Sequence, residues 1–289
     1  MATILDTLKK GSEYLQRHGV DEARLNMELL LAHVLKVDRM RLYLDFDKQL
    51  SESHLDSLRE LTKRRSRGEP VQHLLGTVEF CDLDFLTDAR ALIPRPETEE
   101  LAHLLISSTW PEHMRVLDMG CGSGVIGISL AHHLASRGVA VETILCDFSK
   151  DALALARENV VRLLSPDARI HLIQSDLFEA LEGQSFDLIA ANLPYIPSAS
   201  ETALSREVRQ DPALALYGGV SGTEVMERFL SSVMPHLRPG GTVAMEFGID
   251  QGEKLAALAS DAGLDKVALR KDLSGIERFL FATKSPECC

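Results

Sequence analysis

The sequence predicts an α/β protein in which a mainly parallel sheet, with helices on both faces, follows a small domain made only of helices. Residues 1 to about 68 place apolar side chains at helical spacing. After residue 91, strand-length apolar runs alternate with helical patterns, which is typical of a parallel sheet. Short β-like pieces between them predict a hairpin. We therefore expect a helical domain at 1–70, a β-hairpin linker at 71–90 and an α/β domain at 91–289.

The helical domain ends in a predicted helix that begins after Ser51 and stops before Gly68 and Pro70. Its last turn carries the basic cluster 63–67. Positive charge at the carboxyl end of a helix is favoured by the helix dipole. Because the cluster is a single turn of charge in an acidic protein, we interpret it as a solvated helix end rather than a contact with nucleic acid.

The α/β domain opens with an extended segment held by Pro94 and Pro96, and acidic residues then suit the first turn of a helix. Helices are predicted to start near Ser123, Ser149, Gly222 and Asp250. Residues 266–284 hold two further strand candidates, which we expect to form a closing antiparallel pair. The main predicted strands are 114–119, 141–147, 169–175, 186–192 and 241–248.

Composition narrows the possible partners and location. The chain has 289 residues and a net charge of −12, so neither DNA nor an anionic membrane would attract it as a whole. We find no signal peptide and no apolar run long enough to span a membrane. The five cysteines, without a Cys-x-x-Cys pair, fit reduced thiols in the cytoplasm and argue against a zinc site. Cys288 and Cys289 are expected to lie in an exposed, disordered end.

A glycine-rich turn follows the first main strand and predicts a nucleotide-like cofactor. Glycines let the backbone turn sharply and approach a ligand, and the following helix offers unpaired N–H groups. The stretch from Gly122 to Gly127 also fits the dinucleotide pattern, with Asp147 20 residues further on, so an NAD-type oxidoreductase is an alternative. The candidate residues of the turn are Asp118, Gly120, Cys121, Gly122, Ser123 and Gly124.

Two further acidic residues end neighbouring strands. Asp147 suits a contact to ribose hydroxyls, although it could instead cap the helix that begins near Ser149. Asp176 ends the third strand, where an adenine could lie between apolar side chains; capping the short helix that follows is an equal alternative. Asp118 can brace the glycine turn or approach a cationic cofactor.

The fourth strand ends in Asn192, Leu193, Pro194 and Tyr195, which a hydride transfer does not need. The lone pair of an amide or amino nitrogen is delocalised, so the nitrogen attacks a carbon poorly. Acceptors around its N–H groups, such as the Asn192 side-chain oxygen and the Leu193 carbonyl, would favour the attacking geometry. If the attacked carbon is bonded to a sulfonium, the donor already carries a positive charge, so neutral acceptors are adequate. We expect Tyr195 to stack on the flat substrate group and Pro194 to keep the turn rigid.

These residues resemble the HemK/PrmC family of protein-glutamine methyltransferases, which modify peptide-chain release factors. The resemblance covers nearly the whole chain, and its most specific part is the Ile-Pro-Arg-Pro-Glu-Thr segment at 93–98. It also includes the glycine turn, the stretches 67–76, 175–178 and 186–189, and the motifs at 207–208, 211–212, 218–219, 239–241 and 246–248.

The resemblance implies a Rossmann-like S-adenosylmethionine-dependent domain that follows a helical domain which docks the release factor. The chemistry expected at residues 192–195 requires no metal. It implies methylation of the glutamine side-chain amide in the Gly-Gly-Gln loop of class I release factors, with S-adenosylhomocysteine as product. The turn, Asp147, Asp176, Leu177 and Asn192 would then hold the donor, and residues 192–195 the glutamine. This chain has Leu193 where the family usually has proline. The family uses the backbone carbonyl of that residue, which leucine also has. We therefore expect leucine in place of proline to loosen the acceptor site only modestly.

Two other functions remain as alternatives. A nucleic-acid adenine methyltransferase would bind a similar flat amino group, but it would need a basic groove. A noncatalytic adaptor could keep the fold and bind release factors, although intact Asn192 and Tyr195 argue against this. We further expect a cytoplasmic monomer that forms no stable complex with nucleic acid or membranes.

Overall fold

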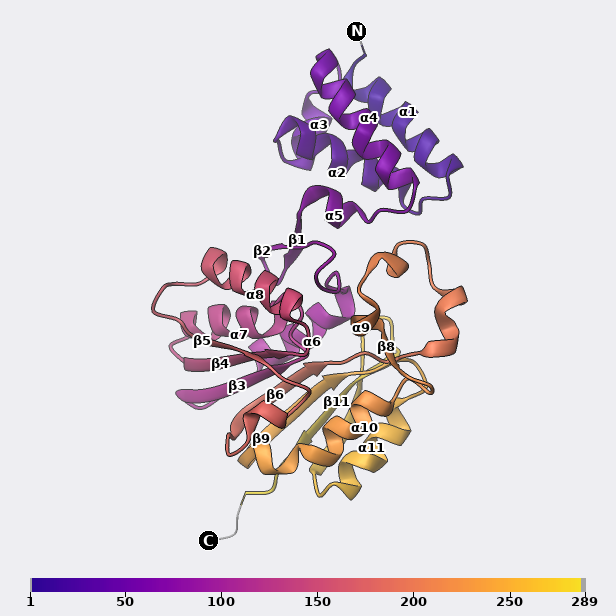
Figure 1. Cartoon of the computed structure of the whole chain (residues 1–289). Coiled ribbons are helices and arrows are strands. Elements are labelled where there is room, and N and C mark those ends of the chain that lie inside the picture. Colours follow the sequence, from indigo (N-terminus) through magenta and orange to yellow (C-terminus); the bar gives the residue numbers. More distant parts are fainter. Residues whose placement is uncertain (1, 287–289) are drawn as a thin grey trace. The chain divides into compact units, whose positions relative to one another are not determined.

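The structure is a computed structural model that describes residues 2–286, apart from the side chains of residues 201–203, so Cys288 and Cys289 lie outside the described residues. The chain divides into two compact units (Figure 1). The first comprises Met1–Thr77 with Ser205–Gln210, and the second comprises Val78–Leu204 with Asp211–Cys289. Within the described residues, no helix is long and apolar enough to cross a membrane.

The first unit is helical, as predicted. Thr3 and Ser51 accept hydrogen bonds from the first turns of two of its helices, which explains where these helices begin. Leucines such as Leu8, Leu30 and Leu58 bury the apolar faces against one another. The helices are α1 (Ile4–Arg17), α2 (Ala23–Leu35), α3 (Arg39–Leu44), α4 (Glu52–Ser66) and α5 (Val71–Leu75). The sequence pattern had missed the short helix α3, and α5 replaces the β-like structure expected at its position.

The end of α4 differs from the solvated end that we expected. The Arg65 side chain is only 2 % exposed, and its guanidinium donates to Asn26 Oδ1 at 2.6 Å and also pairs with Glu207. Arg64 fits the expectation better, because it bridges to Glu69 at the surface. Glu207 lies in Ser205–Gln210, so this distant hexapeptide is part of the helical unit and partners its buried cation.

From Val78 onward the hairpin belongs to the second unit, so it is not a separate linker. Its strands are β1 (Thr77–Phe80) and β2 (Leu83–Leu86). Phe80 and Phe85 are 1 % and 0 % exposed, and their rings meet edge to face with centroids 6.0 Å apart. Both rings lie in a core that they share with apolar side chains of the helices α6 (Pro96–Ser107), α7 (Val125–Ser136) and α8 (Lys150–Leu163). The compact α/β unit therefore starts before residue 91.

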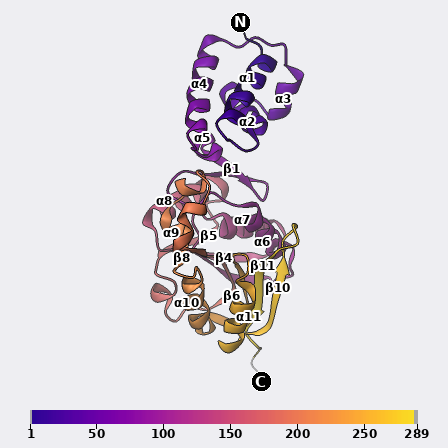
Figure 2. The same cartoon turned by 90° about the vertical axis from the view of Figure 1, so that its right-hand side faces the viewer.

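A seven-stranded sheet forms the centre of the second unit, with strand order β10-β11-β9-β6-β3-β4-β5. Figure 2 shows β10 and β11 side by side. The five strands β5, β4, β3, β6 and β9 run parallel, and β11 and β10 add the expected antiparallel pair. The strands are β3 (His113–Met119), β4 (Ala140–Asp147), β5 (Arg169–Gln174), β6 (Phe186–Asn192), β9 (Leu237–Glu246), β10 (Asp265–Lys271) and β11 (Glu277–Thr283).

Helices cover both faces of this sheet, which confirms the predicted α/β class (Figure 1). One core gathers the apolar side chains beneath α6, α7 and α8, and a second core includes the buried side chains of α10 and α11. The helices are α6 (Pro96–Ser107), α7 (Val125–Ser136), α8 (Lys150–Leu163), α9 (Ala213–Leu216), α10 (Glu224–Ser232) and α11 (Gly252–Asp261). A small pair, β7 (Ile196–Pro197) with β8 (Tyr217–Gly219), lies outside the main sheet.

The strand order decides where a ligand can bind. Strand β3 lies between β4 and β6, so the chain leaves β3 in one direction along the sheet and later returns on its other side. The ends of the two strands are level, since Met119 pairs with Ala191. A crevice opens outside the carboxyl ends at such a point of reversal. The glycine turn follows β3, and the 192–195 segment begins at the last residue of β6, so both border this crevice.

Candidate functional site

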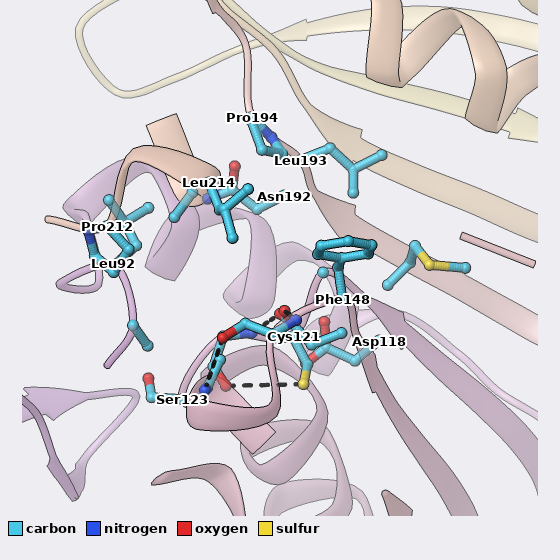
Figure 3. Close-up of a pocket in the computed structure, with 18 of the residues that line it drawn as sticks. Leu92, Asp118, Cys121, Ser123, Phe148, Asn192, Leu193, Pro194, Pro212 and Leu214 are labelled. Atoms are coloured by element: carbon cyan, nitrogen blue, oxygen red, sulfur yellow. Dashed lines mark hydrogen bonds between the residues drawn. The ribbon is translucent and has the colours of Figure 1, made fainter. Parts of the chain in front are cut away.

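A cavity of about 340 Å³ lies at the carboxyl ends of these strands, and all its lining residues belong to the second unit. Figure 3 shows Cys121 and Ser123 of the glycine turn at one side of the cavity, with Asn192 and Pro194 across from them. Segment 90–94, the ends of β4 and β5, and residues of α9 and α10 complete the lining. Elements far apart in the sequence thus form a single enclosure.

The glycine turn is braced from below by Asp118. This side chain is 1 % exposed, and its Oδ2 accepts the Gly127 N–H at 2.8 Å. Among the described residues, its Oδ1 has no hydrogen-bond partner. Burial raises the pKa of Asp118 to about 7. Gly120 has φ +70°, and a Cβ there would meet the Leu193 side chain at 2.9 Å, so a larger residue would push the turn and β6 apart.

Asp147 holds the other side of the same turn. Its Oδ2 accepts the Gly122 N–H and its Oδ1 the Ser149 N–H, both at 2.8 Å. Ser149 itself caps α8 by accepting the Ala152 N–H, so Asp147 is not needed as that cap. Burial raises the pKa of Asp147, while its backbone N–H partners act against this shift. A half-buried carboxylate at a cavity wall, fixed by backbone donors, suits a ligand that offers hydroxyl groups.

The third wall combines an ion pair with apolar surface. Asp176 pairs with Arg228 of α10 at 2.9 Å, and both line the cavity. Leu177 lies beside them in the lining. The sequence reasoning had missed Phe148, whose ring is 57 % exposed and lines the cavity next to Asp147 (Figure 3). Its position directly after Asp147, the acid that ends β4, is the signal in the sequence that could have indicated it.

Asn192 ends β6 and is tied to two residues that the sequence reasoning had not singled out as site residues. Its Nδ2 donates to the Thr98 hydroxyl at 2.8 Å, and that hydroxyl donates to Glu246 Oε2 at 2.7 Å. The Tyr195 hydroxyl donates to the other carboxylate oxygen at 3.3 Å. Thr98 comes from α6, while Glu246 ends β9 directly beside Asn192 in the sheet register. Three elements therefore fix one amide.

The Glu246 carboxyl lies in a mixed electrostatic environment. It is 1 % exposed, and burial raises its pKa to about 7, with the negative charge of Glu97 acting in the same direction. The Thr98 and Tyr195 hydroxyls and the cation of Arg278 on β11 stabilise the ionised form and limit the shift. Above that pH Glu246 is a carboxylate with two hydroxyl donors.

An ion pair joins two segments that border the cavity, one around Pro94 and the other around Pro212. Arg95 donates to Asp211 Oδ2 at 2.6 Å, and the Ile93 N–H donates to Oδ1 at 3.2 Å. The Asp211 side chain is fully buried, whereas that of Arg95 is 32 % exposed, so only the carboxylate end of this pair is shielded from solvent. It brings Pro94 together with Pro212 and the residues of α9 along one wall. Asp211 had been noted only as part of a family motif, and its partner lies 116 residues away.

Most predicted site residues line this one cavity, and two do not. The lining includes Asp118, Gly120, Cys121, Gly122, Ser123, Asp147, Asp176, Leu177, Asn192, Leu193 and Pro194. Gly124, at φ +86°, instead caps the start of α7. Tyr195 lies outside the lining, packs against the core and directs its hydroxyl to Glu246, so its expected stacking on a substrate stays a prediction.

Comparison with known proteins assigns both parts of the chain. Residues 6–76 match the PrmC N-terminal domain, and residues 97–217 match the methyltransferase small domain. A release factor glutamine methyltransferase of Geobacter sulfurreducens is 40 % identical over 96 % of this chain and 95 % of its own. Proteins of the same name from Rhodopirellula baltica and Caulobacter vibrioides are 36 % and 34 % identical, each over 98 % of this chain and 97 % of its own.

Solved structures share the fold at much lower identity. The catalytic domain of hMettl16, solved with the MAT2A 3'UTR hairpin 6, has a TM-score of 0.55 and 15 % identity over 72 % of this chain and 77 % of its own. The 16S rRNA N2 G1207 methyltransferase of T. thermophilus has a TM-score of 0.51 and 19 % identity over 72 % of this chain and 49 % of its own. At these identities the likeness supports the Rossmann-like methyltransferase fold alone.

Proposed function

The chain belongs to the family of release factor glutamine methyltransferases, and from this we infer that it transfers a methyl group from S-adenosylmethionine to the glutamine side-chain amide of a release factor. One observation carries the step from family to site. The glycine turn and Asn192 follow adjacent parallel strands and line one cavity, so a donor and an acceptor amide can meet there. Neither NAD chemistry, nor adenine methylation of nucleic acid, nor a noncatalytic role gains support from the curated relatives.

The donor site that we propose fits the groups present. S-adenosylmethionine, when bound, supplies a methyl group on a positively charged sulfur. Asp147 presents a carboxylate to ribose hydroxyls, and Phe148 and Leu177 offer apolar surface to a planar base. Asp118 keeps one buried carboxylate oxygen without a partner among the described residues, which suits a nearby cation. Gly120 and Gly122 let the backbone approach the ligand closely.

The acceptor site that we propose is built around Asn192. Its Oδ1 accepts an N–H of the substrate amide, and the Leu193 carbonyl accepts the other, which favours the geometry in which nitrogen attacks carbon. Such preorganised acceptors act through position and electrostatics. The positive charge passes with the methyl group from sulfur to the nitrogen and then leaves as one N–H proton released to solvent, so no acceptor has to carry a charge. We therefore propose that the reaction needs no metal.

We also propose finer properties of the reaction. The acceptor is the glutamine of the Gly-Gly-Gln motif in class I release factors, and the helical domain at residues 1–70 docks that partner. We propose that the protein acts as a monomer. The charge of −12 argues against stable binding of nucleic acid. Because release factors act in translation, we place the reaction in the cytoplasm.

The function is tested by incubating the full chain with S-adenosylmethionine and a class I release factor, followed by mass spectrometry of the tryptic peptides. We expect one added methyl group, located by fragmentation on the glutamine of the Gly-Gly-Gln motif. A release factor with that glutamine changed to alanine is the matched control and should gain no mass. Methylation of another residue would contradict the assignment, and so would the absence of any methylated peptide after prolonged incubation.

Donor binding gives a prediction at Asp147. Asp147→Ala should weaken S-adenosylhomocysteine binding by about 1–3 kcal/mol, because it removes hydrogen bonds to a charged group. It also frees the Gly122 N–H that shapes the turn. Isothermal titration calorimetry measures the change. Asp151→Ala is the control, since Asp151 is an exposed carboxylate in the first turn of α8 and should not alter affinity. Unchanged affinity in Asp147→Ala would remove this residue from the donor site.

A further inference from the structure

We propose that Thr98 is a positioning residue for Asn192: its hydroxyl, anchored on Glu246, sets which atom of the Asn192 amide remains for the substrate. The proposal rests on the proposed function, since Asn192 is there the acceptor for the glutamine amide. It starts from the chain of hydrogen bonds that links Glu246, Thr98 and Asn192.

The donor and acceptor roles in these hydrogen bonds follow from the chemistry of Glu246, where the series ends. An ionised carboxylate can only accept hydrogen bonds, so the Thr98 hydroxyl must use its single proton on Glu246 Oε2. The Thr98 oxygen then has only lone pairs to offer to Asn192. The Asn192 amide therefore turns its NH₂ group towards the Thr98 oxygen, and Nδ2 donates to that oxygen at 2.8 Å. Oδ1 is thereby left free to accept from another donor.

The choice matters because the two ends of the amide have opposite roles. With Nδ2 held by Thr98, the Asn192 atom available to a substrate amide is an acceptor, which is what an N–H of the attacking nitrogen requires. Were the side chain turned over, it would present a second donor to that N–H and repel it. The Asn192 side chain has no way to set this preference itself, since its oxygen and NH₂ group have nearly the same shape.

Buried surroundings keep this series of hydrogen bonds in place. Thr98 is 3 % exposed and Glu246 is 1 % exposed, so water cannot easily replace either partner. The second oxygen of Glu246 is taken up by the Tyr195 hydroxyl. Glu97 on α6 and Arg278 on β11 are the charged groups that act on Glu246, and their effects oppose each other. Thr98 also lines the cavity, so the hydrogen-bonded series reaches the place where the acceptor amide is expected.

The experiment compares Thr98→Val with Thr98→Ser in the full chain at about pH 8, above the pKa of Glu246 near 7. Valine keeps the shape and removes the hydroxyl, whereas serine keeps the hydroxyl. Single-turnover methylation of the release factor at saturating donor should fall about 10-fold to 100-fold in Thr98→Val, with little change in release-factor KM. Thr98→Ser should recover most of the rate. Affinity for S-adenosylhomocysteine and the melting temperature check that each variant is folded.

A double-mutant cycle with Asn192→Ala separates positioning from a purely structural role. If Thr98 acts through Asn192, adding Thr98→Val to Asn192→Ala should not lower the rate further. An equal loss in both backgrounds would overturn the proposal, as would wild-type turnover in folded Thr98→Val. A wild-type chain that fails to methylate the Gly-Gly-Gln glutamine would instead refute the proposed function.

Discussion

Replacing Asn192 by alanine should lower single-turnover methylation by about 10²-fold to 10³-fold, the usual loss when one preorganised hydrogen-bonding group at the reacting atoms is removed. Binding of S-adenosylhomocysteine should change only a few-fold, because Asp147 and the glycine turn remain. The reason lies in position: Asn192 ends β6 across the cavity from the turn, and its amide is fixed by Thr98. Rapid-quench kinetics at saturating donor, with calorimetry for affinity, separates the two effects.

Asn192→Gln is the matched variant for this prediction. It keeps the amide and lengthens the side chain by one methylene, which displaces the acceptor oxygen. Because a displacement of about 1 Å can lower a rate 10²-fold, Asn192→Gln should lose most of its activity as well. If Asn192→Ala methylates at the wild-type rate, the 192–195 segment is only a turn at a strand end, and the mechanism proposed for the acceptor is wrong.

Replacing Phe85 by alanine should lower the unfolding free energy of the α/β unit by about 3–5 kcal/mol, the usual loss for a fully buried phenylalanine. Phe85 is 0 % exposed and packs against Phe80 in the core beneath α6, α7 and α8. Trp110 is the only tryptophan of the chain and packs against the same core, so its fluorescence during urea denaturation follows this unit.

The exposed Phe148 provides the control for this measurement. Phe148→Ala removes the same ring from a site that is 57 % exposed, so it should change stability by less than about 1 kcal/mol. Equal unfolding curves for Phe85→Ala and wild type would show that the hairpin is dispensable to the core. For the same reason, a chain shortened to begin at residue 91 should be much less stable than one that begins at Val78.

How far the sequence allows these conclusions depends on the range of the interactions involved. The glycine turn and Asn192 were visible because each is a local motif at a strand end. Their common cavity follows from β3 and β6 being neighbours, and strand order is not written in any local pattern. Thr98 and Glu246 are 148 positions apart, so the bond between them could not be inferred from spacing.

The misread elements have the same explanation. The basic cluster at the end of α4 looks like solvated surface, yet Arg65 is buried because Asn26 and the distant Glu207 supply its partners. The pattern around Phe80 and Phe85 correctly suggests a hairpin. It contains no information on which core the two rings enter, so its assignment as a linker did not fit the structure.

The hexapeptide Ser205–Gln210 has a consequence for building chimaeras within this family. Although both of its flanks belong to the α/β unit, the segment itself belongs to the helical unit. Exchanging the first 77 residues for those of another member would leave Glu207 facing an unmatched surface. A transplanted buried arginine would meet this hexapeptide in place of its own, and a buried cation that fails to pair with a carboxylate is strongly destabilising. A working graft therefore has to transfer two pieces of sequence, the amino-terminal stretch and its matching hexapeptide.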